Sequence, residues 1–455
     1  MKSILVIGGG LVGAACAIRL QAAGVQVTLI DPGDKRRGAS YGNAGHIGSE
    51  QVAPWSAWGN VLRAPRSSFG AGGPLDFRWS DVALWTPWSM QFLRACDPAR
   101  FERGREALIA LLADSLPAWH RIAELAGAPE IVIPHGHATA WMTARGAEDG
   151  LAAFAKAKWG NTNYREMTGA ELERYGGVLN RSPHAAVIFS GTGQVSEPQA
   201  AREAILASFA ERGGETVVGS VARVEANARA TFADGSAREA DAVLVCAGPW
   251  SRRLMEQLGV RAPLIGERGY HLQSAETNWP RDLPTTVFDE NFIAVSRFTS
   301  GLRATSFVEF GSPDAPGDER KWRRLRQRID ELGIKFSDTP DRWVGSRPSL
   351  PDFMPAIGRL ERAPKVLYAF GHAHLGLTEA PITAEIIAAI AAEKAPPVDV
   401  ASFRIERFVG DAKHPQMLRK RHPAQPKATS RTLGNGAALE DIATTVPSND
   451  LPAAN

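Results

Sequence analysis

The chain has 455 residues, a formal net charge of +3, and hydrophobic and charged fractions of 44% and 22%. Such a composition is typical of a globular protein with the core of two or three domains, and the small net charge gives no indication of nucleic-acid binding. No apolar run approaches the roughly 18 residues of a membrane span, and the apolar N-terminus reads as a strand and a helix instead of a signal peptide. The three cysteines lack the spacing of metal ligands. We therefore expect a protein of the reducing cytoplasm with no metal site.

Residues 3–31 predict a nucleotide-binding unit of strand, helix and strand. A short β-branched apolar run fills residues 3–7, as in a buried parallel strand. An Ala-rich helical stretch ends at Gly24, and an apolar run over residues 25–30 leads to Asp31. A carboxylate just beyond the second strand can accept hydrogen bonds from an adenosine ribose.

Between the first strand and the helix, Gly8, Gly10 and Gly13 form the pattern Gly-x-Gly-x-x-Gly. Gly8 suits a tight turn, Gly10 lets the backbone approach a pyrophosphate, and Gly13 lets the helix pack on the strand. The N–H groups at the start of the helix, around Leu11 and Val12, favour phosphate charge. The motif predicts a cofactor with an ADP half and does not distinguish FAD from NAD.

Beyond Asp31 the alternation of strand and helix stops. Residues 33–50 are rich in glycine and polar side chains, and residues 54–92 are rich in tryptophan and proline. An aromatic cluster of this kind contacts a membrane surface or packs around a substrate pocket, and both interpretations stay open. Residues 105–125 predict an amphipathic helix.

The second half of the chain predicts further strands and helices. A helix capped by Ser196, with Pro198 in its first turn, should run to Arg212. A charged, solvent-facing helix is expected over residues 319–332, and an apolar helix over residues 382–393. The remaining segments are expected to be strands at residues 216–224, 230–232, 242–248, 269–273, 294–308 and 366–370, a loop at 347–352 and a glycine and histidine turn at 371–378.

Four stretches together resemble the D-amino acid oxidase superfamily of FAD-dependent amine oxidoreductases. They are the glycine motif with Asp31, residues 40–45 (Ser-Tyr-Gly-Asn-Ala-Gly), residues 245–251 (Val-Cys-Ala-Gly-Pro-Trp-Ser), and residues 345–352 followed by residues 371–378. Within the superfamily, the chain is most similar to bacterial D-amino acid dehydrogenases and their D-hydroxyproline dehydrogenase relatives. The resemblance runs from Met1 to about Phe408.

This resemblance implies an α/β (α+β) fold, in which a Rossmann-type FAD-binding domain is interleaved with a substrate domain. The FAD-binding domain is expected to be discontinuous, with segments 1–50, 190–260 and 341–395. Segments 51–189 and 261–340 are expected to form the substrate domain around an antiparallel sheet. Residues 411–455 have few aromatic residues and many Pro, Lys, Arg, Ala and Thr residues, which predicts a disordered tail.

The resemblance also implies which residues bind FAD. Residues 40–48 would lie along the flavin, the turn at Ala247 near the adenosine, and the strand around Val221 beside the adenine. The turn before the last helix would direct N–H groups at the flavin N1 and C2 carbonyl, where a helix dipole stabilises negative charge. The expected cofactor-binding residues are Gly8, Gly10, Leu11, Val12, Gly13, Asp31, Ser40, Tyr41, Gly42, Asn43, His46, Ile47, Val221, Ala247, Gly248, Trp250, Gly371, His374, Leu375, Gly376, Leu377 and Thr378.

Two residues are candidates for the catalytic site. Relatives place the arginine that corresponds to Arg347 against the substrate carboxylate, and a guanidinium fork matches a carboxylate through two parallel hydrogen bonds. The alternative for Arg347 is a structural ion pair with Asp352 or another acid. Tyr270 is the second candidate for carboxylate binding, with a core tyrosine as the alternative. No general base is nominated, because positioning and electrostatics can supply most of the catalysis. His46 stands where the resembling dehydrogenases often have an amide, which concerns the substrate side chain.

The expected activity is FAD-dependent oxidative deamination of a D-amino acid, with D-proline and hydroxyproline among the candidate substrates. The alternatives are an oxidase or demethylase of glycine or N-methyl amino acids, and a flavin-binding subunit of an electron-transfer complex. The expected partner is a small amino-acid substrate, with no nucleic acid. The protein is expected in the cytoplasm, either free or in peripheral contact with the inner face of the membrane, where a quinone-linked acceptor would take the electrons. The stereochemistry, the electron acceptor and the oligomeric state stay open.

Overall fold

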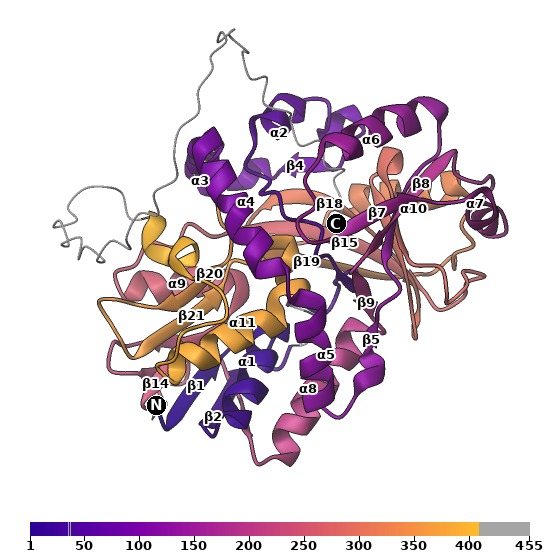
Figure 1. Cartoon of the computed structure of the whole chain (residues 1–455). Coiled ribbons are helices and arrows are strands. Elements are labelled where there is room, and N and C mark those ends of the chain that lie inside the picture. The colour runs from indigo at the N-terminus through magenta and orange to yellow at the C-terminus, as the bar shows by residue number, and fades with distance from the viewer. Residues whose placement is uncertain (35, 37, 409–455) are drawn as a thin grey trace, which may run out of the picture.

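A computed structural model describes residues 1–34, 36 and 38–408 (Figure 1), so the predicted tail lies outside the described residues. The N-terminal unit has the predicted order of β1 (Ser3–Ile7), α1 (Leu11–Ala22) and β2 (Gln26–Asp31). These strands belong to a six-stranded sheet of order β10-β2-β1-β14-β21-β20. Its first five strands are parallel and the last is antiparallel. The other members are β10 (Glu215–Val218), β14 (Ala242–Val245), β20 (Ala356–Arg359) and β21 (Val366–Phe370).

Both faces of this sheet are buried, because successive side chains of a strand point to opposite faces. Ile4 and Val6 of β1 pack into a core with α1, α8 (Pro198–Glu211) and α11 (Gly376–Ala391). Leu5 and Ile7 pack into a second core on the other face. That face is covered by α9 (Ser251–Gln257) and by a three-stranded antiparallel sheet of β11 (Val221–Val224), β12 (Arg229–Phe232) and β13 (Ala237–Glu239).

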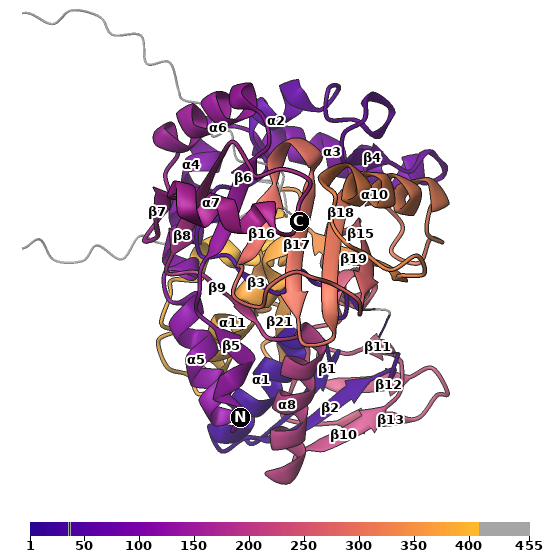
Figure 2. The ribbon, with the colours of Figure 1, turned by 90° about the vertical axis from the view of Figure 1, so that its right-hand side faces the viewer.

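A nine-stranded sheet forms the second large body of the molecule, beside the six-stranded sheet (Figure 2). Its order is β19-β15-β18-β17-β16-β6-β8-β7, with β4 paired to β18. The pairing is antiparallel except for β16 with β6 and β18 with β4. The strands are β4 (Leu75–Phe77), β6 (His137–Trp141), β7 (Asn163–Glu166), β8 (Ala185–Ser190), β15 (Ile265–Ser274), β16 (Thr285–Phe288), β17 (Ile293–Phe298), β18 (Gly301–Gly311) and β19 (Asp341–Ser349).

Helices and a small sheet complete the fold. Helix α10 (Glu319–Leu332) packs on the nine-stranded sheet, and β3 (His46–Ile47) pairs through β9 (Gly193–Val195) with β5 (Val132–Ile133). The other helices are α2 (Trp58–Arg63), α3 (Val82–Ala95), α4 (Pro98–Leu112), α5 (Ser115–Leu125), α6 (Ala144–Lys156) and α7 (Gly169–Gly176). Within the described part of the chain, no helix has both the length and the apolar character to span a bilayer.

The three segments expected to form the FAD-binding domain each contribute strands to the six-stranded sheet. The boundary at residue 341 is the exception, because residues 341–349 form β19, which pairs with β15 of the nine-stranded sheet. The predicted loop at 347–352 is therefore wrong up to Ser349. A local pattern of Arg, Pro and Ser does not reveal a strand that is fixed by a distant partner.

Several helix boundaries also differ from the sequence prediction. The stretch 105–125 is two helices, α4 and α5, and α11 begins at Gly376 instead of residue 382. Glu197 stands at the N-cap of α8 in place of Ser196, without a capping side-chain bond. Lys321 and Arg328 of α10 are buried, so that the expectation of a purely solvent-facing helix is wrong. Of the tryptophans in residues 54–92, Trp88 is buried and Trp79 is 78% exposed, so the cluster divides between packing and surface.

Candidate active site

A cavity of about 430 Å³ lies where the parallel strands of the six-stranded sheet end. It begins at Ile7 of β1, Asp31 of β2 and Phe370 of β21, and extends to Arg347 of β19. The carboxyl ends of parallel strands are the usual ligand site of open α/β sheets. All but three of the sequence-predicted site residues line this one cavity. The three exceptions are Gly13, Ile47 and Gly371.

The three exceptions shape the walls of the cavity. A Cβ atom at Gly13 would lie 1.8 Å from the carbonyl oxygen of Gly8, which is the close contact between helix and strand that the motif requires. Gly371 has a φ of +81°, and a Cβ there would lie 2.5 Å from Leu350. Ile47 is fully buried in β3.

The glycine turn leaves room for a pyrophosphate. Gly8 has a φ of +106°, and a Cβ there would meet the carbonyl oxygen of Cys246 at 2.5 Å. Gly10 is the N-cap of α1, the first turn contains no acidic residue, and the Leu11 N–H donates to the Ser40 hydroxyl (3.0 Å). Gly10, Leu11 and Val12 line the cavity, so the positive end of the helix lies there. Asp31 accepts hydrogen bonds from Gly9 N (2.7 Å) and Gly33 N (2.9 Å), which leaves lone pairs on both oxygens for a ribose. These groups fit the ADP half of a dinucleotide.

Arg202 is a cavity residue that sequence reasoning missed. It lies on α8, is 9% exposed, and donates from Nε to the carbonyl oxygen of Gly9. Its guanidinium thus brings a positive charge to the glycine turn, where phosphate charge is expected. The helix of Arg202 is far from the glycine motif in sequence, and no local signal connects the two.

The loop at residues 40–45 is held by the nine-stranded sheet. Arg303 of β18 is 3% exposed and donates from Nη1 to the carbonyl oxygens of Asn43 (2.6 Å) and Tyr41 (3.3 Å). Gly42 is required by packing, because a Cβ there would lie 2.0 Å from the ring of Trp343. A backbone held in this way presents fixed main-chain groups to the cavity.

The turn before α11 closes another wall. Thr378 accepts from the N–H of Gly48 (2.9 Å) and donates to the carbonyl oxygen of His46 (3.3 Å), so α11 fixes the strand β3. His374 lines the cavity and lies against Trp55, with ring centroids 4.6 Å apart. Burial lowers the pKa of His374 to about 3, so the ring is neutral. His372 interacts through Nε2 with Thr383 (3.1 Å), which is a structural contact.

Arg347 forms an ion pair with a buried acid and also lines the cavity. Its Nη1 donates to Glu267 Oε1 (3.1 Å) and to the carbonyl oxygen of Phe307 (3.3 Å), while the side chain lines the cavity. Both bonds use Nη1, so among the described contacts Nη2 and Nε are left for a ligand. Asp352, the acid named in the prediction, instead pairs with Arg407 at 2.6 Å.

Glu267 is fully buried behind Arg347 and also accepts from the hydroxyl of Ser349 (2.5 Å). Burial raises the pKa of the Glu267 carboxyl, and the charge of Arg347 acts in the opposite direction. Gly269 lets the guanidinium lie over β15, because a Cβ there would be 2.5 Å from Nη2 of Arg347. The guanidinium is thus held by its hydrogen bond to Glu267 and by its packing over Gly269.

Tyr270 corrects one prediction. It contributes to the cavity wall, but its hydroxyl donates to Glu309 Oε2 (2.7 Å) and accepts from Asp318 N (3.2 Å). The reason is the alternation of β15, in which Glu267 and Gly269 point to one face and Tyr270 to the other. The hydroxyl therefore serves a buried network and is not directed at a substrate carboxylate.

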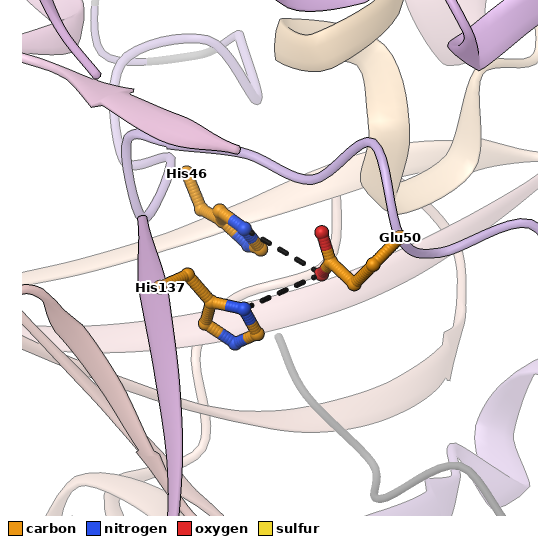
Figure 3. Close-up of side chains that lie close together, drawn as sticks. All are labelled: His46, Glu50 and His137. Atoms are coloured by element: carbon orange, nitrogen blue, oxygen red, sulfur yellow. Dashed lines mark ion pairs between the residues drawn. The ribbon is translucent and has the colours of Figure 1, made fainter. Parts of the chain in front are cut away.

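Two residues that were not predicted, Glu50 and His137, lie beside His46. Glu50 Oε1 lies 3.5 Å from His46 Nε2 and 3.5 Å from His137 Nδ1, as Figure 3 shows. The imidazole rings of His46 and His137 have centroids 4.1 Å apart. The spacing His46-x-x-x-Glu50 was visible in the sequence, whereas His137 comes from β6 of the nine-stranded sheet.

Comparison with known proteins identifies the class of this fold and site. The sequence pattern of the DAO family, described as FAD dependent oxidoreductase, matches residues 3–390. The chain is 32% identical over 426 residues to a D-amino-acid oxidase from Bradyrhizobium diazoefficiens, covering 90% of this chain and 99% of that protein. The chain therefore belongs to the DAO family of FAD-dependent oxidoreductases.

Solved structures share the fold at low sequence identity. Glycine oxidase from Geobacillus kaustophilus has a TM-score of 0.67 at 18% identity, covering 90% of this chain and 100% of that one. L-proline dehydrogenase from P. horikoshii has a TM-score of 0.65 at 16% identity, covering 90% and 98%. The predicted superfamily and fold class are confirmed. The cofactor is FAD, which resolves the choice that the glycine motif left open.

Proposed function

We propose that the protein oxidises the Cα–N bond of a D-amino acid to an imine, which water hydrolyses to an oxo acid and ammonia. The observation that carries this proposal is the guanidinium of Arg347, which lines the cavity with Nη2 and Nε available. The relative from Bradyrhizobium diazoefficiens, a D-amino-acid oxidase by name, supports the substrate class. D-Proline and hydroxyproline are the first substrates to test.

In this reaction FAD supplies the hydride acceptor. The residues of the chain bind and orient the substrate. Arg347 would hold the carboxylate through parallel charge-assisted hydrogen bonds, and Glu267 would keep the guanidinium in position. Holding the carboxylate at one end fixes the Cα–H at the other, which is the positioning that a hydride transfer needs.

We also propose that the exposed apolar side chains of α2, α3 and residues 79–81 contact a membrane surface. Leu62 and Trp79 are each 78% exposed and Met90 is 55% exposed, and exposed arginines at 66 and 94 would complement anionic lipid. Co-sedimentation with vesicles that contain anionic lipid tests this contact. The double variant Leu62→Ser/Trp79→Ser should abolish it, and binding that is unchanged in the variant would exclude this surface.

The substrate is tested by anaerobic mixing of the purified holoenzyme with D- and L-amino acids, glycine, N-methyl amino acids and amines that lack a carboxylate. Loss of flavin absorbance reports oxidation of the substrate. Bleaching by D-amino acids, with weak or no response to L-enantiomers and plain amines, is expected. Bleaching by glycine or sarcosine alone would favour the oxidase or demethylase alternative, and no bleaching at all would favour an electron-transfer subunit. Reoxidation of the bleached enzyme by oxygen, compared with a soluble quinone, identifies the electron acceptor.

A further inference from the structure

His46, Glu50 and His137 form a buried cluster (Figure 3), hereafter the His–Glu–His cluster, of which His46 lines the cavity. Their side chains are 2–4% exposed. Within the described residues, Nε2 of His46, both oxygens of Glu50 and both ring nitrogens of His137 are buried without a hydrogen-bond partner. Buried polar atoms are normally paired, so a concentration of unpaired ones at one point indicates a functional role.

The charge state of the cluster follows from its surroundings. Burial would raise the pKa of Glu50, but the charges that His46 and His137 can carry outweigh burial and hold this pKa at about 2. Burial lowers the pKa of His137 to about 3, and that of His374 likewise. At neutral pH the Glu50 carboxylate is therefore ionised and the His137 ring is neutral.

Only His46 of the three lines the cavity, and Glu50 and His137 lie behind it. The strand of His46 is fixed by Thr378 at the start of α11, through Gly48 N and His46 O. Nε2 of the His46 ring lies 3.5 Å from Glu50 Oε1, and the residue lines the cavity. The titratable and charged groups near His46 are Glu50, His137, His374 and, beyond His374, Arg347.

An amino acid reaches the cavity mainly as the ammonium form, which cannot transfer its Cα–H as hydride until one proton has left the nitrogen. We propose that His46, which lines the cavity and is held against the Glu50 carboxylate, accepts this proton, with His137 as a second positioning residue. This inference rests on the proposed function. It adds a catalytic residue, His46, to a reaction in which Arg347 has a binding role.

The proton and the electrons balance in this step. One N–H bond of the ammonium group breaks, its electron pair stays on the substrate nitrogen, and a new N–H bond forms on His46. The resulting imidazolium pairs with the Glu50 carboxylate, so the buried cluster becomes neutral as the substrate amine becomes neutral. The substrate amine is then in the neutral form from which Cα–H can leave as a hydride with its two electrons, for which bound FAD would supply the acceptor, and the His46 proton leaves to water with the product.

The first test is the pH dependence of kcat/KM for the best substrate of the panel. In the wild-type enzyme kcat/KM should rise through the ionisation of the cluster and reach a plateau below the pKa of the free substrate ammonium. His46→Gln keeps an amide of similar size but cannot accept the proton. Its kcat/KM should be about 100-fold lower at neutral pH. It should rise tenfold per pH unit and approach the wild-type value only where the free amine is neutral.

Glu50→Gln separates the positioning role from a structural one. Without the carboxylate the imidazolium is less stable, so the rising limb of the profile should move to lower pH, with a plateau about tenfold lower. A purely structural role would lower the whole profile without moving the limb. His184→Gln, at an exposed histidine, is the matched control and should leave the profile unchanged.

A second measurement does not depend on turnover. The Cα-methylated analogue of the best substrate cannot lose a hydride, and its binding by calorimetry in two buffers counts the protons released. The wild-type holoenzyme should release none, because His46 retains the proton, whereas His46→Gln should release about one per analogue bound as the neutral amine. Equal proton release in both proteins, or superimposable pH profiles, would overturn the proposal.

Two further outcomes are distinguishable. Failure of every amino acid to bleach the wild-type flavin refutes the proposed function, whereas bleaching with an unshifted His46→Gln profile refutes only the role of His46. One polar atom from each of the three side chains lies within 4.8 Å of the others, a spacing that a divalent cation could also use. One equivalent of zinc in the purified holoenzyme, lost in Glu50→Gln, would assign the cluster to a metal and overturn the proton-acceptor role.

Discussion

The two faces of β15 carry buried charges of opposite kinds. On the cavity face, Glu267 holds Arg347 by one nitrogen and leaves the rest of the guanidinium available. On the other face, Arg268 and Lys321 share the carboxylate of Glu309 at 2.5 and 2.9 Å. That network also includes Asp76, Asp318 and the Tyr270 hydroxyl.

The difference separates charged residues that bind a ligand from charged residues that only stabilise the fold. Buried charges that are fully paired within the protein stabilise one arrangement of the chain and have nothing left to bind a ligand. Arg347 has unpaired nitrogens at the cavity, and His46 lines the same cavity in front of the unpaired polar atoms of Glu50 and His137. Unpaired groups in a fixed position are what a substrate can complete. If substitutions on the two faces of β15 have the same effect on stability and on catalysis, the two faces do not differ in role.

The largest expected effect is that of Lys321→Met on stability. Lys321 is fully buried, so removal of its charge leaves Glu309 and Asp76 with an incomplete partner set. Breaking a buried pair costs about 3–5 kcal/mol. Chemical denaturation should show this loss, while kcat/KM per folded, FAD-loaded enzyme changes by less than a few-fold at permissive temperature. An unchanged denaturation midpoint would show that the network does not stabilise the fold.

Arg347→Ala should have its effect on catalysis. Loss of the carboxylate partner costs about 2–5 kcal/mol, which is about 30-fold or more in kcat/KM for amino acids. FAD content should be retained because the residues expected to bind the ADP half line another part of the cavity, and the rate with an amine that lacks a carboxylate should hardly change. Arg347→Lys should recover only part of the loss, since an ammonium has no fork. If kcat/KM falls equally for amines and amino acids and FAD is lost, the role of Arg347 is structural.

Gly269→Ala tests, with a single added methyl group, whether the position of the Arg347 guanidinium matters for catalysis. The added Cβ would overlap Nη2 of Arg347, so the guanidinium must move while its charge and its pair with Glu267 remain. We expect a fall in kcat/KM of about tenfold, from roughly 1–2 kcal/mol of misplaced binding. Gly169→Ala, where a Cβ would meet nothing within 4 Å, is the control and should be neutral. If Gly269→Ala behaves like its control, the position of the guanidinium is not critical.

Tyr270→Phe should have the smallest effect. The phenol donates to a carboxylate that retains Arg268 and Lys321, so stability should fall by only about 1–2 kcal/mol. Steady-state kinetics should give a KM for the amino acid within about twofold of wild type. A rise in KM of tenfold or more, confined to carboxylate substrates, would restore Tyr270 to the site.

The predictability of each feature depended on how far apart in sequence its determinants lie. The glycine turn, α1 and Asp31 could be predicted because strand period, glycine positions and helix capping act within about 30 residues. The pairing of β19 with β15, and the pairing of Glu267 with Arg347, depend on segments that meet only in the folded chain. The same applies to His137, whose strand has no local signal that connects it to Glu50.

The face of β15 to which Tyr270 points was also beyond sequence reasoning. Alternation shows that neighbours point to opposite sides, but the register with β18 and β19 decides which side is the cavity. The cavity residues within 40–48 and 371–378 were predicted from the resemblance to a family. No hydrophobic periodicity in these two stretches indicates them.

The order of the six-stranded sheet has a consequence for synthesis in the cell. The strand β1 ends at residue 7, whereas its neighbour β14 begins at residue 242 and β21 ends at residue 370. At about 5–20 residues per second, synthesis of the chain from the end of β1 to the end of β21 takes roughly 20–75 seconds. Until β14 has been synthesised, the edge of β1 that will pair with it has no partner, and an unpaired apolar edge is a site at which chains aggregate. A chain that ends before residue 366 lacks β21 and cannot complete the six-stranded sheet, and FAD can stabilise only a chain that has completed its binding site.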